Sequence, residues 1–225
     1  MDIYVHYFSD RKQALEFVNS LKFSSISDIY ITTPKADAPT SIILSNNFLD
    51  ENLDWEYVES QGYTVERAPY SFGEYGVYLS IPDSSFTIMI PTDTQEQFSI
   101  PYVDAMFERL YGCKKPNYRT KTNDFMVGDK KVLGRLFFND GDFYHLIGSL
   151  NSIPTELDKI FTDKWLENSG KTLPSERVLG YREAVDDYEA TIEDFAEALK
   201  FRMNEQLKNT IQDIVVIDMD KGESK

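Results

Sequence analysis

The stretch TNDFMVGDKKVLGRLFF, residues 122–138, carries most of what the sequence indicates about the fold. Two apolar runs flank Gly128-Asp129, a pair that favours a tight turn, so the stretch predicts a β-hairpin. Side chains alternate along a strand, which divides the second strand of this hairpin into two faces. One face would carry Lys131, Leu133 and Arg135, and the other Val132, Gly134 and Leu136. A glycine inside a strand, such as Gly134, often marks the close approach of a ligand or another backbone.

Basic residues gather around this hairpin in a chain that is otherwise acidic. The 225 residues include 23 Lys and Arg against 38 Asp and Glu, a formal net charge of −15. The basic group consists of Lys114, Lys115, Arg119, Lys121, Lys130, Lys131 and Arg135. It is either a solvated face or an anion site for a nucleotide or another phosphate-bearing ligand. The acidic remainder repels phosphate backbones, so no nucleic-acid partner is expected.

The rest of the chain predicts an α+β fold with mixed, mostly antiparallel sheets flanked by helices. Short apolar runs such as residues 3–8 alternate irregularly with a few helical segments, and several runs are joined by hairpin turns. The most regular helix is expected at residues 191–208, where Thr191 begins a capping box. We expect a single domain over residues 1–210, followed by a frayed C-terminal tail at residues 211–225.

Composition excludes several kinds of site. With 41% hydrophobic residues, the chain can bury a core without disulfides or a structural metal. Its one cysteine, Cys113, cannot form an intramolecular disulfide or a multi-cysteine zinc site. The only histidines, His6 and His145, have no partner at ligand spacing, so no metal site is expected. Neither a signal peptide nor a membrane span is apparent, and a cytoplasmic location is the expectation.

Four segments, in order, resemble the lipoate–protein ligase family, whose fold is that of the biotin/lipoate ligase catalytic domain. The most specific is residues 122–138, which resembles the signature N-D-(L/I)-x-V-x-G-x-K-(I/V)-S-G. The others are SIILSNNFLDENLDWEYVESQGYTVERA (41–68), DFYHLIGSL (142–150) and LPSERVLGYREAVDDYEATIEDFAEALKFRMNEQL (173–207). The resemblance therefore extends over most of the chain and supports the same α+β fold.

The resemblance assigns the catalytic role to Lys131, because Val132-Leu133-Gly134 follow it as the signature requires. A cation at this position would stabilise charge when a carboxylate attacks the α-phosphate of ATP. Asn123, Asp124 and Gly134 fall on nucleotide-binding positions. Mg²⁺ would accompany the nucleotide and needs few protein oxygens.

The same resemblance places Arg67 and His145 beside an acyl pocket, together with Gly73 and Gly76 of the loop between them. This loop departs most from the family, since ERAPYSFGEYGV stands where the family has R-R-x-S-G-G-G-A-V. It has fewer glycines, and it carries the bulky side chains of Tyr70, Phe72 and Tyr75, which could fill the space where backbone must approach the acyl chain.

The implied reaction has two steps. Lipoate, octanoate or a related short acid would react with ATP to give an acyl-adenylate, which would then acylate a lysine of a lipoyl domain. No C-terminal accessory domain is expected after the last helix, so a separate accessory subunit could take part. The alternative is a catalytically degenerate relative that binds an acyl-carrier domain or a small acid. The loop at residues 71–76 distinguishes these two hypotheses. It would surround an adenylate in the ligase, whereas in the binding protein it would block the adenylate site.

Overall fold

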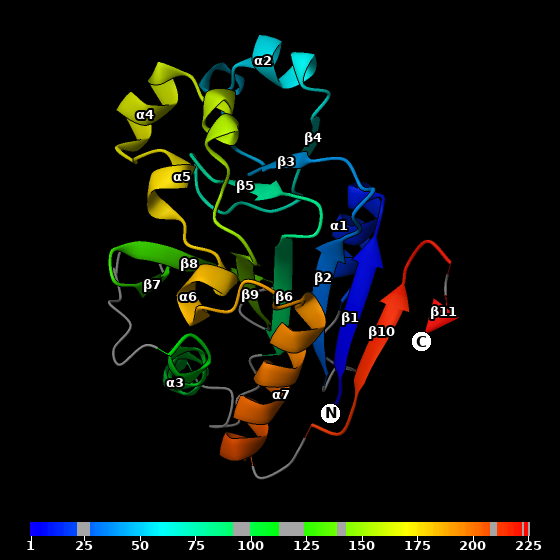
Figure 1. The fold of residues 1–225 in the computed structure, drawn as a ribbon. Coiled ribbons are helices and arrows are strands. Elements are labelled where there is room, and N and C mark those ends of the chain that lie inside the picture. The colour runs from blue at the N-terminus through cyan, green and yellow to red at the C-terminus, as the bar shows by residue number, and fades with distance from the viewer. Residues whose placement is uncertain are drawn as a thin grey trace.

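The computed structural model describes residues 1–21, 28–91, 100–112, 124–138, 143–207, 211–221 and 223–224. Its main sheet has eight strands in the order β11-β10-β1-β2-β6-β9-β8-β7, and a second sheet has three in the order β4-β3-β5 (Figure 1). In the main sheet only the β10-β1-β2 pairings are parallel. The fold is thus α+β with mixed, mostly antiparallel sheets flanked by helices, as the sequence predicts.

The strands of the main sheet are β1 (Ile3–Phe8), β2 (Ile29–Pro34), β6 (Ser85–Pro91), β7 (Phe125–Val127), β8 (Lys130–Phe138), β9 (Phe143–Ser149), β10 (Ile214–Asp218) and β11 (Glu223–Ser224). Those of the small sheet are β3 (Ser41–Leu44), β4 (Thr64–Arg67) and β5 (Val77–Ser80). The helices are α1 (Arg11–Ser20), α2 (Trp55–Ser60), α3 (Ile100–Leu110), α4 (Asp163–Ser169), α5 (Pro174–Arg177), α6 (Tyr181–Val185) and α7 (Ile192–Leu207), with 3-10 turns at Asp50–Asn52 and Thr155–Ile160. None of the helices in the described ranges is long and apolar enough to cross a membrane.

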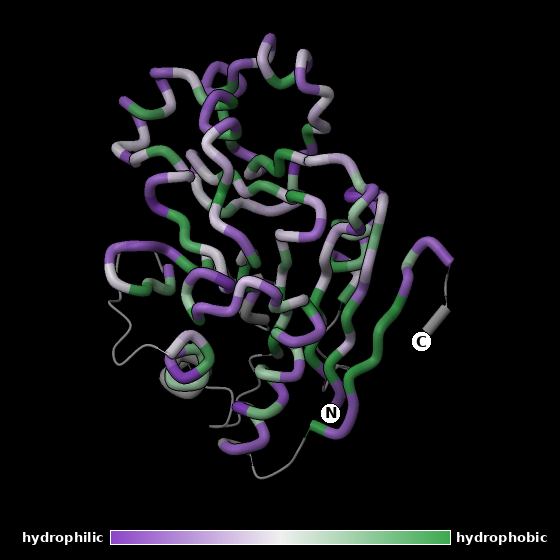
Figure 2. The backbone as a smooth tube through the Cα atoms, viewed as in Figure 1, coloured by the Kyte–Doolittle hydropathy of each residue, from purple (hydrophilic) through white to green (hydrophobic). Residues whose placement is uncertain are grey.

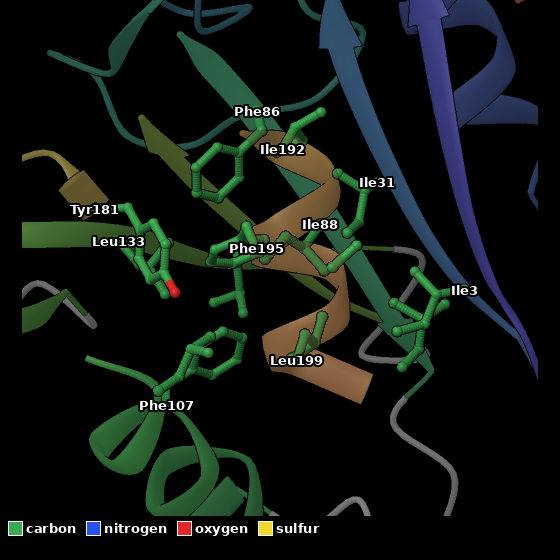
Figure 3. Packing of buried hydrophobic residues seen from close by; sticks show 14 of the residues in the cluster. Ile3, Ile31, Phe86, Ile88, Phe107, Leu133, Tyr181, Ile192, Phe195 and Leu199 are labelled. Carbon is green, nitrogen blue, oxygen red and sulfur yellow. The ribbon is translucent and has the colours of Figure 1, made fainter. Parts of the chain in front are cut away.

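The main core lies between the large sheet and helices α3 and α7. Phe86 and Ile88 of β6 meet Phe195 and Leu199 of α7, and Phe107 of α3 closes the lower side (Figure 3). The rings of Phe86 and Phe195 lie 4.6 Å apart, within the range of favourable aromatic pairs. Helix α1 covers the opposite face of the sheet, where its apolar side packs on the other side of β6. Helices therefore cover both faces of the large sheet, and hydrophobic residues alternate with less hydrophobic ones along β1 and β2 (Figure 2).

Helix α7 begins where the capping box predicts. The Thr191 hydroxyl accepts a hydrogen bond from the Asp194 backbone N–H at 3.1 Å, and the Asp194 carboxylate accepts one from the Thr191 backbone N–H at 2.8 Å. Each side chain thus satisfies a backbone donor that the first turn of a helix leaves unpaired.

A second core lies under the small sheet. Leu44 of β3 and Val58 of α2 pack with Ile160 and Trp165, which come from the segment after β9. Trp165 is fully buried and its ring stacks on that of Phe161 at 4.1 Å. This segment therefore packs against the small sheet. It then runs back to the large sheet through α5, which lies between the two sheets (Figure 1).

The expectation of a frayed tail at residues 211–225 is wrong for its central part. Strand β10 pairs in parallel with β1, from Ile3 opposite Ile214 to Tyr7 opposite Asp218. The Lys35 ammonium lies 2.5 Å from carboxylate oxygens of both Asp218 and Asp220 and fixes the end of the strand. Without β10, the backbone groups of β1 on that edge would have no partner within the sheet.

We expect that a chain lacking residues 211–225 melts at a temperature roughly 5 °C or more below that of the full chain, because it loses the β1–β10 ladder. Its open β1 edge should also promote association. A chain lacking only residues 222–225 retains β10 and serves as the control. Thermal denaturation followed by circular dichroism, together with size-exclusion chromatography, measures both effects. Equal melting temperatures for all three chains would contradict the conclusion that β10 stabilises the main sheet by pairing with β1.

Candidate functional site

A cavity of about 830 Å³ lies between the β7–β8 hairpin, strands β5 and β9, and the segment from the end of α4 to α5. Apolar side chains form much of its wall, among them Phe72, Val77, Leu79, Ile147, Ile153 and Phe161. Charged side chains also reach it: Asp124, Asp129, Lys131, Lys171, Glu176 and Arg177. This mixture of an apolar wall with a few charged groups is typical of sites for small ligands.

The predicted hairpin is present, but the predicted division of its second strand into two faces is wrong. Neighbouring residues of β7 pair with Lys131 and Leu133, so Val132 is an extra residue in β8, a β-bulge. Val132 and Leu133 are both buried in the main core. The bulge shifts the alternation by one position and turns Lys131 onto the face of Gly134 instead of the face of Leu133.

The ammonium of Lys131 lies directly over Gly134. A Cβ atom at residue 134 would be 3.0 Å from Nζ and 3.1 Å from Cε of Lys131. Lys131 Nζ also forms an ion pair of 2.7 Å with Oδ1 of Asp124. The close approach that Gly134 permits is therefore that of the Lys131 side chain, and it fixes the amine beside a carboxylate inside the cavity.

The segment around α5 docks on β8 at the same point. The backbone N–H of Leu179 donates to the carbonyl of Lys131 at 2.9 Å, and Lys131 forms an isolated parallel bridge with Val178. The Lys130 ammonium donates to the carbonyl of Glu176. The docking brings two further cations, Lys171 and Arg177, to the cavity wall.

The cations of the cavity are held where solvation is poor. Burial, together with the charges of Arg177 and Lys131, lowers the pKa of Lys171 to about 8, although the Asp124 carboxylate opposes the change. Burial also lowers the pKa of Lys131, although the Asp124 carboxylate opposes the change. The pKa of Arg177 is lowered by burial in the same way. All three shifts disfavour the charged forms, so an anionic ligand would stabilise the cavity.

Comparison with known proteins was made at the level of sequence and of structure. No protein-family model matches the chain, and no curated protein matches it. P. falciparum LipL1 in complex with lipoate is 17% identical, with a TM-score of 0.67 over 98% of this chain and 66% of that one, so this chain spans just under two thirds of that protein. Lipoate-protein ligase A bound with ATP is 16% identical, with a TM-score of 0.64 over 96% and 90% of the two chains.

A third similar structure comes from an archaeal lipoylation system, a bi-partite lipoate protein ligase and its E2 lipoyl domain from Thermoplasma acidophilum. It is 15% identical, with a TM-score of 0.62 over 96% of this chain and 86% of that one. This chain has the lipoate–protein ligase fold. The hairpin with its Lys131–Asp124 pair and the docked α5 segment lie within residues 122–138 and 173–207, two of the segments in which the sequence resembles the lipoate–protein ligase family.

The acyl-pocket residues expected from the ligase family are not gathered in one place. Gly76 lines the cavity, whereas Gly73, Arg67 and His145 do not. Arg67 forms an ion pair with Asp50 and donates to the carbonyl of Phe48 at 2.9 Å, with 40% of its side chain exposed. Its guanidinium is thus held on the outside of the small sheet, a correction to its expected position beside the acyl group.

His145 is buried behind the aromatic residues of the loop. Its side chain is only 1% exposed, and its Nδ1 atom lies 3.5 Å from the hydroxyl of Tyr70. Arg11, also buried, donates to the hydroxyl of Tyr78, and Tyr78 and Phe72 lie between this cluster and the cavity, which both of them line. Burial and the nearby Arg11 charge lower the pKa of His145 to about 3. Tyr70, Phe72 and Tyr78 therefore separate His145 from the cavity.

Several of the predicted residues lie outside the described ranges. These are Asn123, Cys113 and four of the basic residues, Lys114, Lys115, Arg119 and Lys121. Within the described ranges, no three His, Cys, Asp or Glu side chains are close enough together to hold a metal ion. Sequence reasoning missed Lys171 and Arg177, although Arg177 lies in a segment that resembles the family. Nothing around Lys171 in the sequence distinguishes it from a surface lysine.

Alanine variants of two glycines should differ in their effect on stability, because one glycine faces core side chains and the other faces Lys131. A Cβ atom at Gly148 would lie 2.7 Å from Phe86 and Leu133 side chains, so Gly148→Ala should lower the free energy of unfolding by about 1–3 kcal/mol. Gly134→Ala displaces only the flexible end of Lys131 and should cost less than about 1 kcal/mol. Urea denaturation of both variants tests this, and equal losses would contradict the assignment of the space over Gly134 to Lys131.

The buried histidine makes stability depend on pH. The folded-state pKa of His145 is about 3, below its ordinary value of 6.5, so the unfolded chain binds a proton first and stability falls as the pH drops from 6.5 toward 3. At about pH 5 the loss due to His145 should reach up to about 2 kcal/mol relative to about pH 7. His145→Gln should lose correspondingly less stability over this interval in urea denaturation. An identical pH dependence in the variant would contradict a neutral, buried His145.

Proposed function

We propose that the chain is a ligase that activates lipoate, or a related short acid, with ATP and transfers it to a lysine of a lipoyl domain. One observation carries the proposal: the Lys131 ammonium, paired with Asp124 at 2.7 Å, lies over Gly134 in a cavity with apolar walls. The fold supports it, because the similar structures include ligases described in complex with lipoate and bound with ATP.

In the first step, the carboxylate of the acid attacks the α-phosphorus of ATP, and the bond to the bridging oxygen breaks with loss of pyrophosphate. The Lys131 ammonium stabilises the charge that develops on the α-phosphate oxygens. Asp124 keeps this ammonium in place before the nucleotide arrives. Mg²⁺ enters with ATP and neutralises phosphate charge, and the carboxylates of Asp124 and Asp129 at the cavity wall would hold it.

In the second step, a lysine amine of the lipoyl domain attacks the carbonyl carbon of the acyl-adenylate and AMP leaves. Phe72, Ile147 and Phe161 form an apolar wall of the cavity. This wall excludes water from the mixed anhydride until the lysine amine attacks it. The lipoyl domain as partner, and a separate accessory subunit, are supported by analogy with the bi-partite ligase of T. acidophilum.

A second candidate function is that of a binding protein without ligase activity. The positions of two residues favour it: Arg67 pairs with Asp50 outside the cavity, and Tyr70 packs against His145 where acyl contacts were expected. Such a protein would bind an acid or a lipoyl domain in the same cavity but form no adenylate.

Acid-dependent exchange of labelled pyrophosphate into ATP tests the first step. With lipoate or octanoate, wild-type protein should catalyse exchange, and Lys131→Ala should reduce it by at least about a hundredfold, since the cation acts in the transition state. Biotin serves as the comparison acid. Lys164→Ala is the control, because Lys164 is an exposed lysine that pairs with Glu51 outside the cavity.

The assay is run with and without cell lysate as a source of an accessory subunit. Exchange in the wild type that Lys131→Ala leaves unchanged would remove Lys131 from the mechanism. If no acid supports exchange in either condition, while lipoate or a lipoyl domain binds to the protein, the second candidate function replaces the first.

A further inference from the structure

Two cations of the cavity have no counter-ion among the described residues. Of the three, only Lys131 forms an ion pair there, with Asp124. No described carboxylate lies within ion-pairing distance of Lys171 or Arg177. Lys171 instead donates a long hydrogen bond of 3.4 Å to the carbonyl of Tyr75, and its ammonium lies 5.9 Å from the Trp165 ring. Its neighbours therefore hold the Lys171 side chain at the cavity wall without neutralising it.

Keeping three poorly solvated cations close together costs free energy unless an anion binds among them. Three positive side chains share one closely paired carboxylate, and each is shifted toward its neutral form by burial. A bound anion with several oxygens would reverse these shifts and satisfy the donors at once. A polyphosphate matches this requirement better than a carboxylate, because its many oxygens can contact more than one of the cations at once.

The position of Arg67 gives Lys171 a specific role. The family resemblance places Arg67 beside the acyl pocket, but its guanidinium is engaged with Asp50 and with the carbonyl of Phe48 and supplies no charge to the cavity. The site needs more than one cation to stabilise a departing pyrophosphate. Lys171 and Arg177 reach the cavity from the segment docked on β8.

We propose that Lys171, with Arg177 beside it, binds the β- and γ-phosphates of the nucleotide, while Lys131 faces the α-phosphate. Lys171 is then a further catalytic residue, which takes over the cationic role that Arg67 does not fill. The lysine stays protonated throughout the step. A carboxylate oxygen of the acid bonds to the α-phosphorus as the bond from the α-phosphorus to the bridging oxygen breaks. That oxygen keeps the electron pair in the departing pyrophosphate, whose charge the cations stabilise. The inference rests on the proposed function for the identity of the nucleotide, but the phosphate subsite can be tested without any acid.

The subsite should have a pH signature. Lys171 faces Arg177, Lys131 and Asp124, and the two cations outweigh the carboxylate. Because its pKa is about 8 in the free protein, binding of an anion near that pH should draw a proton onto the amine. An arginine at the same position stays protonated and should take up none.

Isothermal titration calorimetry with inorganic pyrophosphate and with ATP, each with Mg²⁺, tests the subsite on the full chain. Lys171→Met should weaken the binding of both ligands by roughly tenfold or more, as expected for loss of a charge-assisted hydrogen bond. Lys171→Arg should bind within about threefold of wild type. Lys164→Met should bind as wild type does. Titrations with ATP near pH 8 in two buffers of different ionisation enthalpy should show greater proton uptake in wild type than in Lys171→Arg.

The outcomes distinguish failure of the phosphate subsite from failure of the proposed ligase function. Equal pyrophosphate affinity in wild type and Lys171→Met, or no pyrophosphate binding by wild type, would overturn the subsite. Acid-dependent exchange that Lys171→Met leaves unaffected would overturn the role of Lys171 and leave the ligase function standing. Lys171-dependent pyrophosphate binding without exchange for any acid would retain the subsite and reject the ligase.

Discussion

The β-bulge at Val132 is the constraint on which the candidate site depends. In a regular strand, Lys131 would share the face of Leu133, which lies in the main core, and its ammonium would have to be buried there or distort the hairpin. The extra residue lets β8 present apolar side chains to the core and a cation to the cavity within three positions. Gly134 completes the device, since any Cβ atom there would push the ammonium away from Asp124.

Charges in the cavity are less well solvated and less screened than charges on the protein surface. The net charge of −15 is spread over a solvated surface, where it is screened and repels polyanions at long range. Inside the cavity, poor solvation strengthens the local field of Lys131, Lys171 and Arg177. These cations are positioned by packing: the stacked Phe161 and Trp165 anchor the returning segment in the second core before it docks on β8. The anion binding that we propose here would therefore be a local property that overall composition does not reveal.

The features that could be predicted from the sequence are those set by neighbouring residues. The turn at Gly128, the cap at Thr191 and the motif that carries Lys131 and Asp124 all depend on short spacings. The features that could not be predicted depend on distant partners. Strand β10 joins β1 across the length of the chain, and Lys171 reaches the cavity only because its segment docks on β8. The bulge belongs with these, because pairing with β7, β9 and the core selects it over regular alternation. For Arg67, motif position alone was misleading, since Asp50 and Phe48 compete for its guanidinium.

The two halves of the site differ in how far they depart from the ligase pattern. The hairpin half keeps the cation, the carboxylate and the glycine in mutual contact. The loop half replaces small residues with aromatic ones, and Tyr70 packs against His145. An acid bound in this cavity would consequently lie along Phe72, Ile147 and Phe161 instead of reaching His145. The proposed phosphate contact and the proposed acyl wall would thus depend in part on different elements: Lys131 lies on β8 of the large sheet, and Phe72 lies on the loop that enters the small sheet.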